Sequence, residues 1–476
     1  MTRNAAIETI SNYFDDGRFK ADLADLVAYQ TESQNPDQAP ELTRYLDEAM
    51  MPRLAGLGFV GQRYDNPVAG AGPILVAERI EAEDLPTILS YGHGDVIHAQ
   101  TDQWREGLQP FAVVEEGERF YGRGTADNKG QHLINIAALE AVLKTRGKLG
   151  FNCRIVIETG EETGSPGLAE FFNAHKDKLG ADVLIASDGP RLQPETPTMF
   201  MGSRGGASFD LAVELHDGAH HSGNWGGLLA DPAMILAQAL AIITDARGQI
   251  RIPEWRPNSL SDEVRTALRD LPVDGGDGPA IDPDWGEENL TPAERAYGWN
   301  SFAILAMKSG VPEAPVNAIS AHARATCQLR FVVGTDPEDI VPALRRHLDK
   351  HGFEAVRIEP HVGGLFQATR LNPDHAWVKF VAKSLRETSG RPPHILPNLA
   401  GSLPNDTFTD ILGLPTVWVP HSYRGCSQHA PDEHVLKPVC RDALRLMAGL
   451  FWDIGDGRFR EDLIRASRPE AGKGQA

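Results

Sequence analysis

The chain has 476 residues and a formal net charge of -20 at pH 7, and this length predicts two domains, each with a core of its own. The acidic excess argues against a nucleic-acid partner and against an anionic membrane surface, and no apolar run is long enough to span a bilayer. The first residues lack a charged stretch followed by an apolar core, and the four cysteines are scattered, so we expect a reduced, cytoplasmic protein.

The first part of the chain alternates helical and strand patterns. Helical periodicity covers residues 2–30 and 40–58, and apolar runs at 73–77 and 86–90 have the form of strands buried on both faces. A helix follows up to Arg146, with Gly147 as its stop, and two further buried runs lie at 153–157 and 181–186. This alternation predicts an α/β domain over residues 1–202.

The pattern changes after about residue 203. Strands with one polar face are expected at 209–215, 301–308, 324–333 and 354–358, with helices at 231–244 and 336–352. This βαββαβ order predicts a ferredoxin-like domain inserted over residues 203–366. The segment 246–300 is expected to be irregular, with one short helix after Ser261.

The first pattern returns over residues 367–476. A helix is expected at 374–388 and a buried strand at 415–419, and the last dozen residues have the composition of a disordered tail. Residues 1–202 and 367–476 are therefore expected to form one domain around the insertion.

The predicted strands of this domain end in side chains that can bind a cation. Beyond the strand ends lie His93, Asp95, Glu161, Glu162, Asp188 and His429, and Asp127 opens a helix. In open α/β sheets, ligands bind beyond the carboxyl ends of the strands. Histidine nitrogen and carboxylate oxygen suit zinc, and a two-metal hydrolytic site needs one shared ligand, for which Asp127 is the natural candidate.

Two of these pairs would have ordinary explanations if they stood alone. A His-x-Asp is usually a surface loop, and two adjacent glutamates are usually a solvated pair. At a strand end, however, Asp95 can accept the second ring N–H of His93 and orient it. One glutamate of Glu161 and Glu162 can then bind a metal while the other serves as general base.

In order along the chain, the blocks Gly92–Asp95, Gly122–Gly130, Glu158–Ser165, Asp188 and His429–Glu433 resemble those of one family. This is the family of co-catalytic zinc metallopeptidases that includes carnosine dipeptidase, glutamate carboxypeptidase, aminoacylase, acetylornithine deacetylase and succinyl-diaminopimelate desuccinylase. The resemblance covers nearly the whole chain. It implies a zinc-peptidase-type mixed sheet flanked by helices, with a ferredoxin-like lid and dimerisation domain inserted into the catalytic domain.

The resemblance also implies two Zn²⁺ ions per subunit, which Mn²⁺ or Co²⁺ could replace. One ion would be bound by His93, Asp127 and Asp188, and the other by Asp127, Glu162 and His429. Asp95 would then be the orienting carboxylate, and Glu161 the general acid and base.

Further site residues follow from the same resemblance. His221, within the block Asp217–Gly227, is similar to the histidine of the dipeptidase branch that reaches the partner subunit's site and stabilises the oxyanion. Asn317 and Arg330 fall at positions similar to substrate-binding ones, and Gly401 with Ser402 resembles a loop that contacts the substrate.

Two departures from the family motifs leave the substrate class open. Thr159 and Gly160 stand inside the glutamate block, and the last block reads His429-Ala430-Pro431-Asp432-Glu433. The hypothesis is a homodimeric hydrolase of small peptides that uses a metal-bridging water activated by a glutamate. The alternatives are a deacylase of N-acyl amino acids or another small-molecule amidohydrolase, a non-catalytic binding relative and, more remotely, a cysteine amidase. On the loop before His429, His421 and Tyr423 are candidates for a substrate contact.

Overall fold

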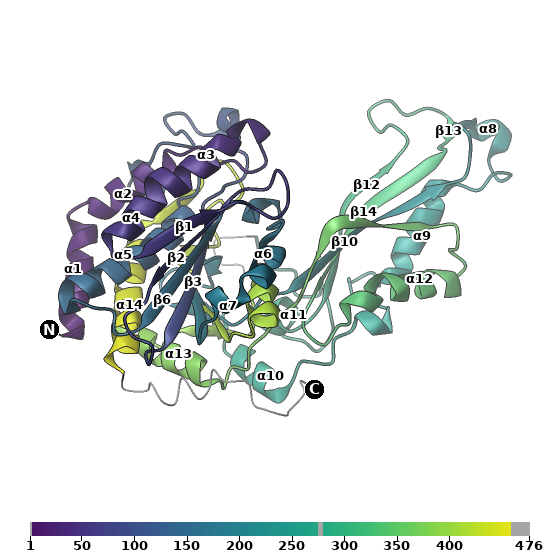
Figure 1. Ribbon diagram of the computed structural model, residues 1–476. Helices are drawn as coiled ribbons and strands as arrows, with labels where there is room; N and C mark the ends of the chain where they lie inside the picture. Colours follow the sequence, from purple (N-terminus) through teal and green to yellow (C-terminus); the bar gives the residue numbers. More distant parts are fainter. Residues whose placement is uncertain (1, 275–278, 458–476) are drawn as a thin grey trace.

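The computed structural model describes residues 2–274 and 279–457, and Figure 1 shows a large body from which a second, elongated part projects. The large body is built on an eight-stranded sheet with the order β1-β2-β6-β3-β7-β17-β9-β16. Its strands are β1 Val60–Tyr64, β2 Ile74–Arg79, β3 Thr87–His93, β6 Asn152–Glu158, β7 Val183–Ala186, β9 Thr198–Phe200, β16 His394–Leu396 and β17 Thr416–Trp418. In the centre, β6, β3, β7 and β17 run parallel as neighbours, so their carboxyl ends meet at one edge.

Both faces of this sheet are buried, which explains why its strands are continuous apolar runs. Successive residues point to opposite faces: Ile88 of β3 packs in one core and Leu89 in the other. The first core is closed by α1 Arg3–Asp15, α2 Arg18–Val27, α5 Lys129–Arg146, α13 Ala376–Ser389 and α14 Lys437–Asp456. The second core contains residues of α6 Leu168–Ala174 and α7 Lys176–Leu179. Together these layers confirm the expected mixed sheet flanked by helices.

Near the N-terminus, the prediction of one helix over residues 2–30 is wrong. The helix breaks into α1 and α2 because Gly17 adopts a φ of 81°, a left-handed conformation that glycine reaches without steric cost. The helix expected at 40–58 is confirmed as a continuous helical segment. It consists of α3 Ala39–Arg44, a π-helical turn Tyr45–Met50 and α4 Met51–Gly56.

The projecting part contains a four-stranded antiparallel sheet with the order β12-β14-β10-β15. Along the chain it consists of β10 Gly205–Glu214, α9 Pro232–Ile243, β12 Ser301–Ser309, β14 His322–Phe331, α12 Ile340–Lys350 and β15 Arg357–Phe366. This βαββαβ order and its strand arrangement confirm the ferredoxin-like prediction. The last strand begins three residues later than expected and extends to Phe366, because it pairs along β10 in two stretches separated by a bulge.

A polar network crosses the outer face of this small sheet. The carboxylate of Asp210 on β10 accepts hydrogen bonds from Thr326 Oγ1 at 2.6 Å, Arg324 Nη2 at 2.6 Å and His361 Nε2 at 3.0 Å. The Asp210 side chain is only 9% exposed, whereas Arg324 is 51% exposed. The three donors therefore stabilise the ionised form of a nearly buried carboxyl group.

The segment 246–300 joins the two parts of the molecule. It forms two short helices instead of the one predicted, α10 Asp262–Leu268 and α11 Pro292–Tyr297. Their apolar residues Val264, Leu268, Ala293 and Tyr297 pack in the second core of the large body, whereas Trp255 packs in the core of the small sheet. In Figure 1, α10 lies where the large body meets the projecting part.

In the part of the chain that the structure describes, no helix combines the length and the apolar character needed to cross a lipid bilayer. The last dozen residues, which were expected to be a disordered tail, lie outside the described residues.

Candidate metal centre and active site

The parallel centre of the large sheet delivers the first group of site residues. His93 is the last residue of β3, Glu161 and Glu162 lie in a 3₁₀ turn just after β6, and Asp188 follows β7 by two residues. Asp127 lies two residues before α5. Neighbouring parallel strands end at the same edge, which is why residues far apart in sequence share one site.

Two small sheets bring the C-terminal loop to this edge. The strand β19 His434–Leu436 pairs with β5 Arg119–Tyr121, which also pairs with β4 Val114–Glu116. The strand β18 Ser422–Tyr423 pairs with β8 Pro190–Arg191, directly after Asp188. Between β18 and β19 lies His429, whose φ of 58° is uncommon for a residue with a side chain. This conformation turns the imidazole towards Asp127.

Asp127 lies between two histidines. Its Oδ1 is 3.1 Å from His93 Nε2, and its Oδ2 is 3.0 Å from His429 Nε2. The same nitrogen of His429 is 3.1 Å from Glu162 Oε2. The two carboxylate oxygens of Asp127 thus face two separate groups of side chains.

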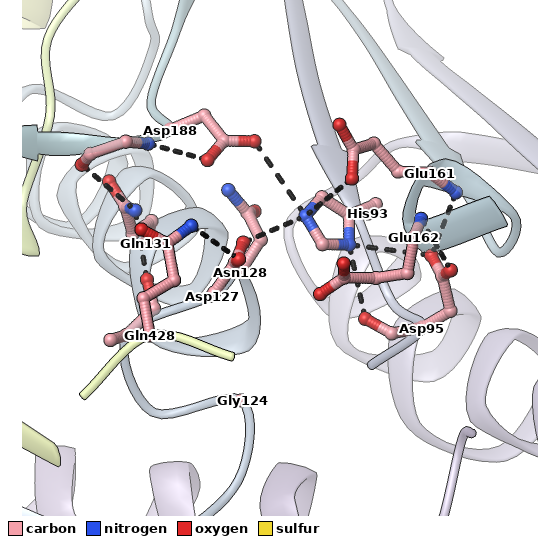
Figure 2. Close-up of polar contacts among 12 residues, drawn as sticks. His93, Asp95, Gly124, Asp127, Asn128, Gln131, Glu161, Glu162, Asp188 and Gln428 are labelled. Atoms are coloured by element: carbon pink, nitrogen blue, oxygen red, sulfur yellow. Dashed lines mark hydrogen bonds and ion pairs between the residues drawn. The ribbon is translucent and has the colours of Figure 1, made fainter. Parts of the chain in front are cut away.

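Figure 2 shows Asp127, Glu161 and Asp188 converging on the ring of His93. From His93 Nε2 the distance is 3.6 Å to Asp188 Oδ2 and 3.9 Å to Glu161 Oε2. Asp188 Oδ2 is buried and has no hydrogen-bond partner among the described residues. A buried carboxylate oxygen without a partner is costly unless a cation binds it.

Asp95 lies where the sequence predicted, but it has a further role. His93 Nδ1 is 3.0 Å from the backbone carbonyl of Asp95 and 3.3 Å from its Oδ1. The Asp95 carboxylate also accepts the backbone N–H groups of Glu161 at 3.2 Å and Glu162 at 3.1 Å. It therefore holds the histidine and the glutamate turn in one arrangement.

The pKa values of these carboxyl groups are shifted first by burial and then by the negative charge of their neighbours. Burial raises the pKa of Glu162 and of Asp188 to about 7, and it raises the pKa of Glu161 well above its usual range. Hydrogen bonds to Asp127 and Glu162 raise the pKa of His429 to about 11. A multivalent cation would relieve this crowding of negative charge in place of protons.

The residues present fit two metal ions that share a ligand. Potential ligand atoms form two groups, and within each group they all lie within 4.8 Å of one another. The first group is His93, Asp127 and Asp188, and the second is Asp127, Glu162 and His429. Each group combines imidazole nitrogen with carboxylate oxygen, the donor set that zinc accepts. Asp127 belongs to both groups, as expected of a bridging carboxylate.

These groups open into a pocket of about 530 Å³. Its lining also includes Arg330, Gly401 and Ser402, three of the residues expected to bind substrate. A larger pocket of about 820 Å³ lies elsewhere, beside Asp262 and His394, and contains none of the clustered ligands. Size alone therefore does not identify the site.

The remaining expected residues lie apart from this pocket. His221 and Asn317 are exposed and close to each other, on β11 His220–His221 and just before β13 Ala318–Ile319. His421 is fully buried and its Nε2 is 2.9 Å from Ser187 Oγ. His421 and the buried Tyr423 do not line the pocket, so the idea that they contact substrate is wrong.

Sequence reasoning missed the clamp formed by Glu433. Its Oε1 accepts backbone N–H groups of Gly124, Ala126 and Asp127 at 3.0, 2.9 and 3.1 Å, and its Oε2 accepts Arg123 Nη1 at 2.8 Å. Arg123 and Glu433 are each 1% exposed. The only available signal was the position of Glu433 four residues after His429.

Two histidine–carboxylate groups that share Asp127, with Glu161 beside them in an open pocket, define a metal-dependent hydrolase. Comparison with protein-family models identifies the family of this hydrolase. The model of the peptidase family M20/M25/M40 matches residues 89–453. The chain belongs to this family. It is a metallopeptidase, and its class catalyses metal-dependent hydrolysis of peptide bonds.

Curated relatives include dipeptidases. The chain is 25% identical over 399 residues to a cysteinylglycine-S-conjugate dipeptidase of Corynebacterium striatum, covering 81% of this chain and 84% of that protein. It is 29% identical over 291 residues to a beta-Ala-His dipeptidase of Rattus norvegicus. That match covers 57% of this chain and 58% of the rat protein, so the chain spans just over half the length of this relative.

Solved structures confirm the fold. Human carnosine dipeptidase 1 has a TM-score of 0.75 at 23% identity, covering 94% of this chain and 100% of that one. The dipeptidase Dug1p of Saccharomyces cerevisiae has a TM-score of 0.78 at 19% identity, covering 96% and 99%.

Proposed function

We propose that this protein hydrolyses the peptide bond of dipeptides and other small peptides with two zinc ions. The observation that carries the proposal is the position of Asp127 between His93 and His429, with Glu161 outside both ligand groups in the same pocket. One ion would be bound by His93, Asp127 and Asp188, and the other by Asp127, Glu162 and His429. When bound, such ions polarise the scissile carbonyl group and make water more acidic, and Mn²⁺ or Co²⁺ could supply the same chemistry.

Glu161 is proposed as the general base and acid. Its carboxylate belongs to neither ligand group, yet it lines the pocket beside both. Burial raises its pKa well above the usual range, which suits a group that must take up a proton from water and release it again. Glu161 would accept the proton of the attacking water and then donate it to the leaving amine. Asp95 holds the backbone of Glu161 in place for both steps.

The other end of the pocket would bind the carboxylate of the substrate. Arg330 and Ser402 line it together with Gly401, and Arg330 Nη1 donates to Ser402 Oγ at 2.6 Å. A guanidinium group can bind a carboxylate with two parallel hydrogen bonds. The distribution of charge, acidic at the ligand groups and basic at Arg330, would align a small peptide across the pocket.

The test begins with protein stripped by a chelator and then restored with zinc or manganese. We expect metal-restored release of amines from a panel of dipeptides. Release from N-acyl amino acids alone would instead identify a deacylase. If metal is bound but no amine is released from either panel, hydrolysis of small amides is refuted.

We propose in addition that residues 203–366 act as a lid and dimerisation domain between the catalytic segments 1–202 and 367–476. The edge strand β12 exposes Ile304, Leu305 and Met307 to 47%, 57% and 50%. An apolar edge strand with unpaired backbone groups favours pairing with a second copy. In such a dimer, His221 and Asn317 would complete the partner's site, with His221 as the oxyanion donor.

Mixing two inactive variants tests this contribution across the dimer. Glu161→Gln abolishes the base of its own subunit, and His221→Ala removes the residue offered to the partner. After random reassociation, half of the dimers are mixed and one site of each is intact, so we expect about a quarter of wild-type activity. No recovery in confirmed mixed dimers would refute the role of His221 in the partner subunit.

We also propose a cytoplasmic location. Cys153, Cys327, Cys426 and Cys440 are buried and unpaired, as expected of a protein kept in a reducing compartment. Fractionation of cells of the source organism, followed by immunoblotting, tests this location.

A further inference from the structure

The basic end of the pocket holds arginines without acidic partners. Arg330 and Arg424 line the pocket, and Ser402 joins Arg330 to the backbone carbonyl of Arg204. Over residues 2–274 and 279–457, no carboxylate lies within ion-pair distance of these three guanidinium groups. The chain has a net charge of -20, so carboxylates are plentiful. Because these pocket arginines still have no carboxylate partner in the described part of the chain, they indicate a site for an anion from outside the chain.

The hydrogen bonds that these arginines do make end on neutral acceptors. Arg204 donates from Nε to the carbonyl of Ala400 at 2.7 Å, and Arg330 donates to Ser402 Oγ at 2.6 Å. Arg424 donates from Nη2 to the hydroxyl oxygen of Tyr297. Because Tyr297 accepts this bond, its own hydroxyl proton stays available for an anion in the pocket.

The three arginines and Tyr297 are electrostatically connected. Burial lowers the pKa of Arg204 to about 10, and the nearby charge of Arg330 acts in the same direction. Burial raises the pKa of Tyr297, whereas Arg424 and Arg204 act in the opposite direction. Contacts also connect these residues: Ser402 Oγ accepts from Arg330 and donates to the Arg204 carbonyl at 2.8 Å, and Arg424 donates to Tyr297. Arg330, Tyr297 and Arg424 all line the pocket, and we call these three residues together with Arg204 the basic wall.

Two arginines on the pocket surface exceed what one carboxylate needs. In the proposed function, Arg330 binds the terminal carboxylate of the substrate. Arg330 lies on β14, whereas Arg424 directly follows β18. Arg424 is held by Tyr297 of α11, 127 residues away in sequence, so it presents a second, separate donor group. A second carboxylate on the same residue of the substrate is the simplest ligand that uses both.

We propose that Arg424 and Tyr297 bind a side-chain carboxylate, and that the preferred substrates release a C-terminal glutamate or aspartate. This inference rests on the proposed peptidase function, because it assigns the released residue to the basic wall. The ligand class is a small dicarboxylate amino acid joined through its amino group to an acyl or aminoacyl group.

The experiment compares Ala-Glu with its neutral analogue Ala-Gln, and Ala-Asp with Ala-Asn. A hydrogen bond to a charged group predicts that wild-type protein prefers the acidic member by about 10- to 100-fold in kcat/KM. In Arg424→Gln this ratio should fall about tenfold or more, and in Tyr297→Phe it should fall by less. Arg391→Gln serves as the matched control, because Arg391 lines the other pocket, and its ratio should equal that of the wild type.

Two results would overturn the inference: a wild-type ratio near one, or an Arg424→Gln variant that loses acidic and neutral substrates equally. The second result would place Arg424 on the terminal carboxylate. Calorimetry with L-glutamate and L-glutamine provides a readout that needs no turnover. If the protein binds glutamate but not glutamine, and Arg424→Gln removes this binding, the subsite is supported even if no peptide is cleaved. If dipeptides are cleaved without a preference for acidic residues, only the peptidase function is supported.

Discussion

The clamp made by Glu433 predicts that one buried carboxylate controls both stability and metal affinity. Its four acceptor contacts join the loop that carries His429 to the loop that carries Asp127, 306 residues apart. Removing one partner of a buried ion pair leaves the other charge unpaired, which costs about 3–5 kcal/mol. We therefore expect Glu433→Ala to lose about 3–5 kcal/mol of the free energy of unfolding, because Arg123 is left buried without a counterion.

The variant Glu433→Gln separates the two roles. Its carbonyl oxygen can still accept the backbone N–H groups of the Asp127 loop, but its amide faces Arg123 without charge. Contacts that hold metal ligands in position contribute about 10- to 100-fold to metal affinity. We therefore expect Glu433→Gln to bind zinc about 10- to 100-fold more weakly than the wild type. The Arg123→Met/Glu433→Gln double variant should lose less stability than the sum of the single variants, by about 0.5–3 kcal/mol.

Urea denaturation of the metal-free protein measures the first effect, and competition with a chromophoric chelator measures the second. Asp15→Asn is the control, because Asp15 pairs with Arg441 on the surface, where both side chains are at least 40% exposed; its unfolding midpoint should not change. If Glu433→Gln lowers stability but binds zinc like the wild type, the clamp supports only the fold and the reasoning about metal affinity is refuted.

Three further predictions concern the base, the metals and the small sheet. Glu161→Gln should lower kcat by about 10²- to 10⁴-fold with the metal content unchanged by atomic absorption; an active variant would exclude Glu161 as the base. Metal removal should lower the thermal midpoint, and added zinc should raise it again with concentration, whereas a midpoint independent of zinc contradicts the proposed centre. Burial raises the pKa of Asp210, but bonds from Thr326, Arg324 and His361 outweigh it and lower the pKa from 3.8 to about 2. The stabilisation by Asp210, about 1–2 kcal/mol after solvent screening, should be complete above pH 5 or so and disappear as the pH falls towards about 2. Denaturation at several pH values should show the difference between wild type and Asp210→Asn shrinking over this range, and a constant difference would contradict the assignment.

Local sequence patterns were sufficient for most of the fold. The apolar runs of β3, β6, β7 and β17 are short and continuous because both faces of each strand are buried, and such runs are typical of a parallel sheet. The candidate ligands were predicted from the same property, since residues placed after parallel strands must meet at one edge. Their division into two sets was implied by the family resemblance. Errors arose where one residue decides a boundary, as at Gly17 between α1 and α2.

Contacts between loops could not be predicted in this way. Three contacts join segments that share no common periodicity. They are the bonds of Glu433 to the Asp127 loop, of Asp95 to the backbone of the glutamate turn, and of Arg424 to Tyr297. The sequence by itself determined which side chains carry metal-binding chemistry and which strands deliver them, because these depend on local order. Only the tertiary structure decided how the loops hold those side chains and which charges remain without partners, because hydrogen bonding and desolvation depend on distances between segments that fold from opposite ends of the chain.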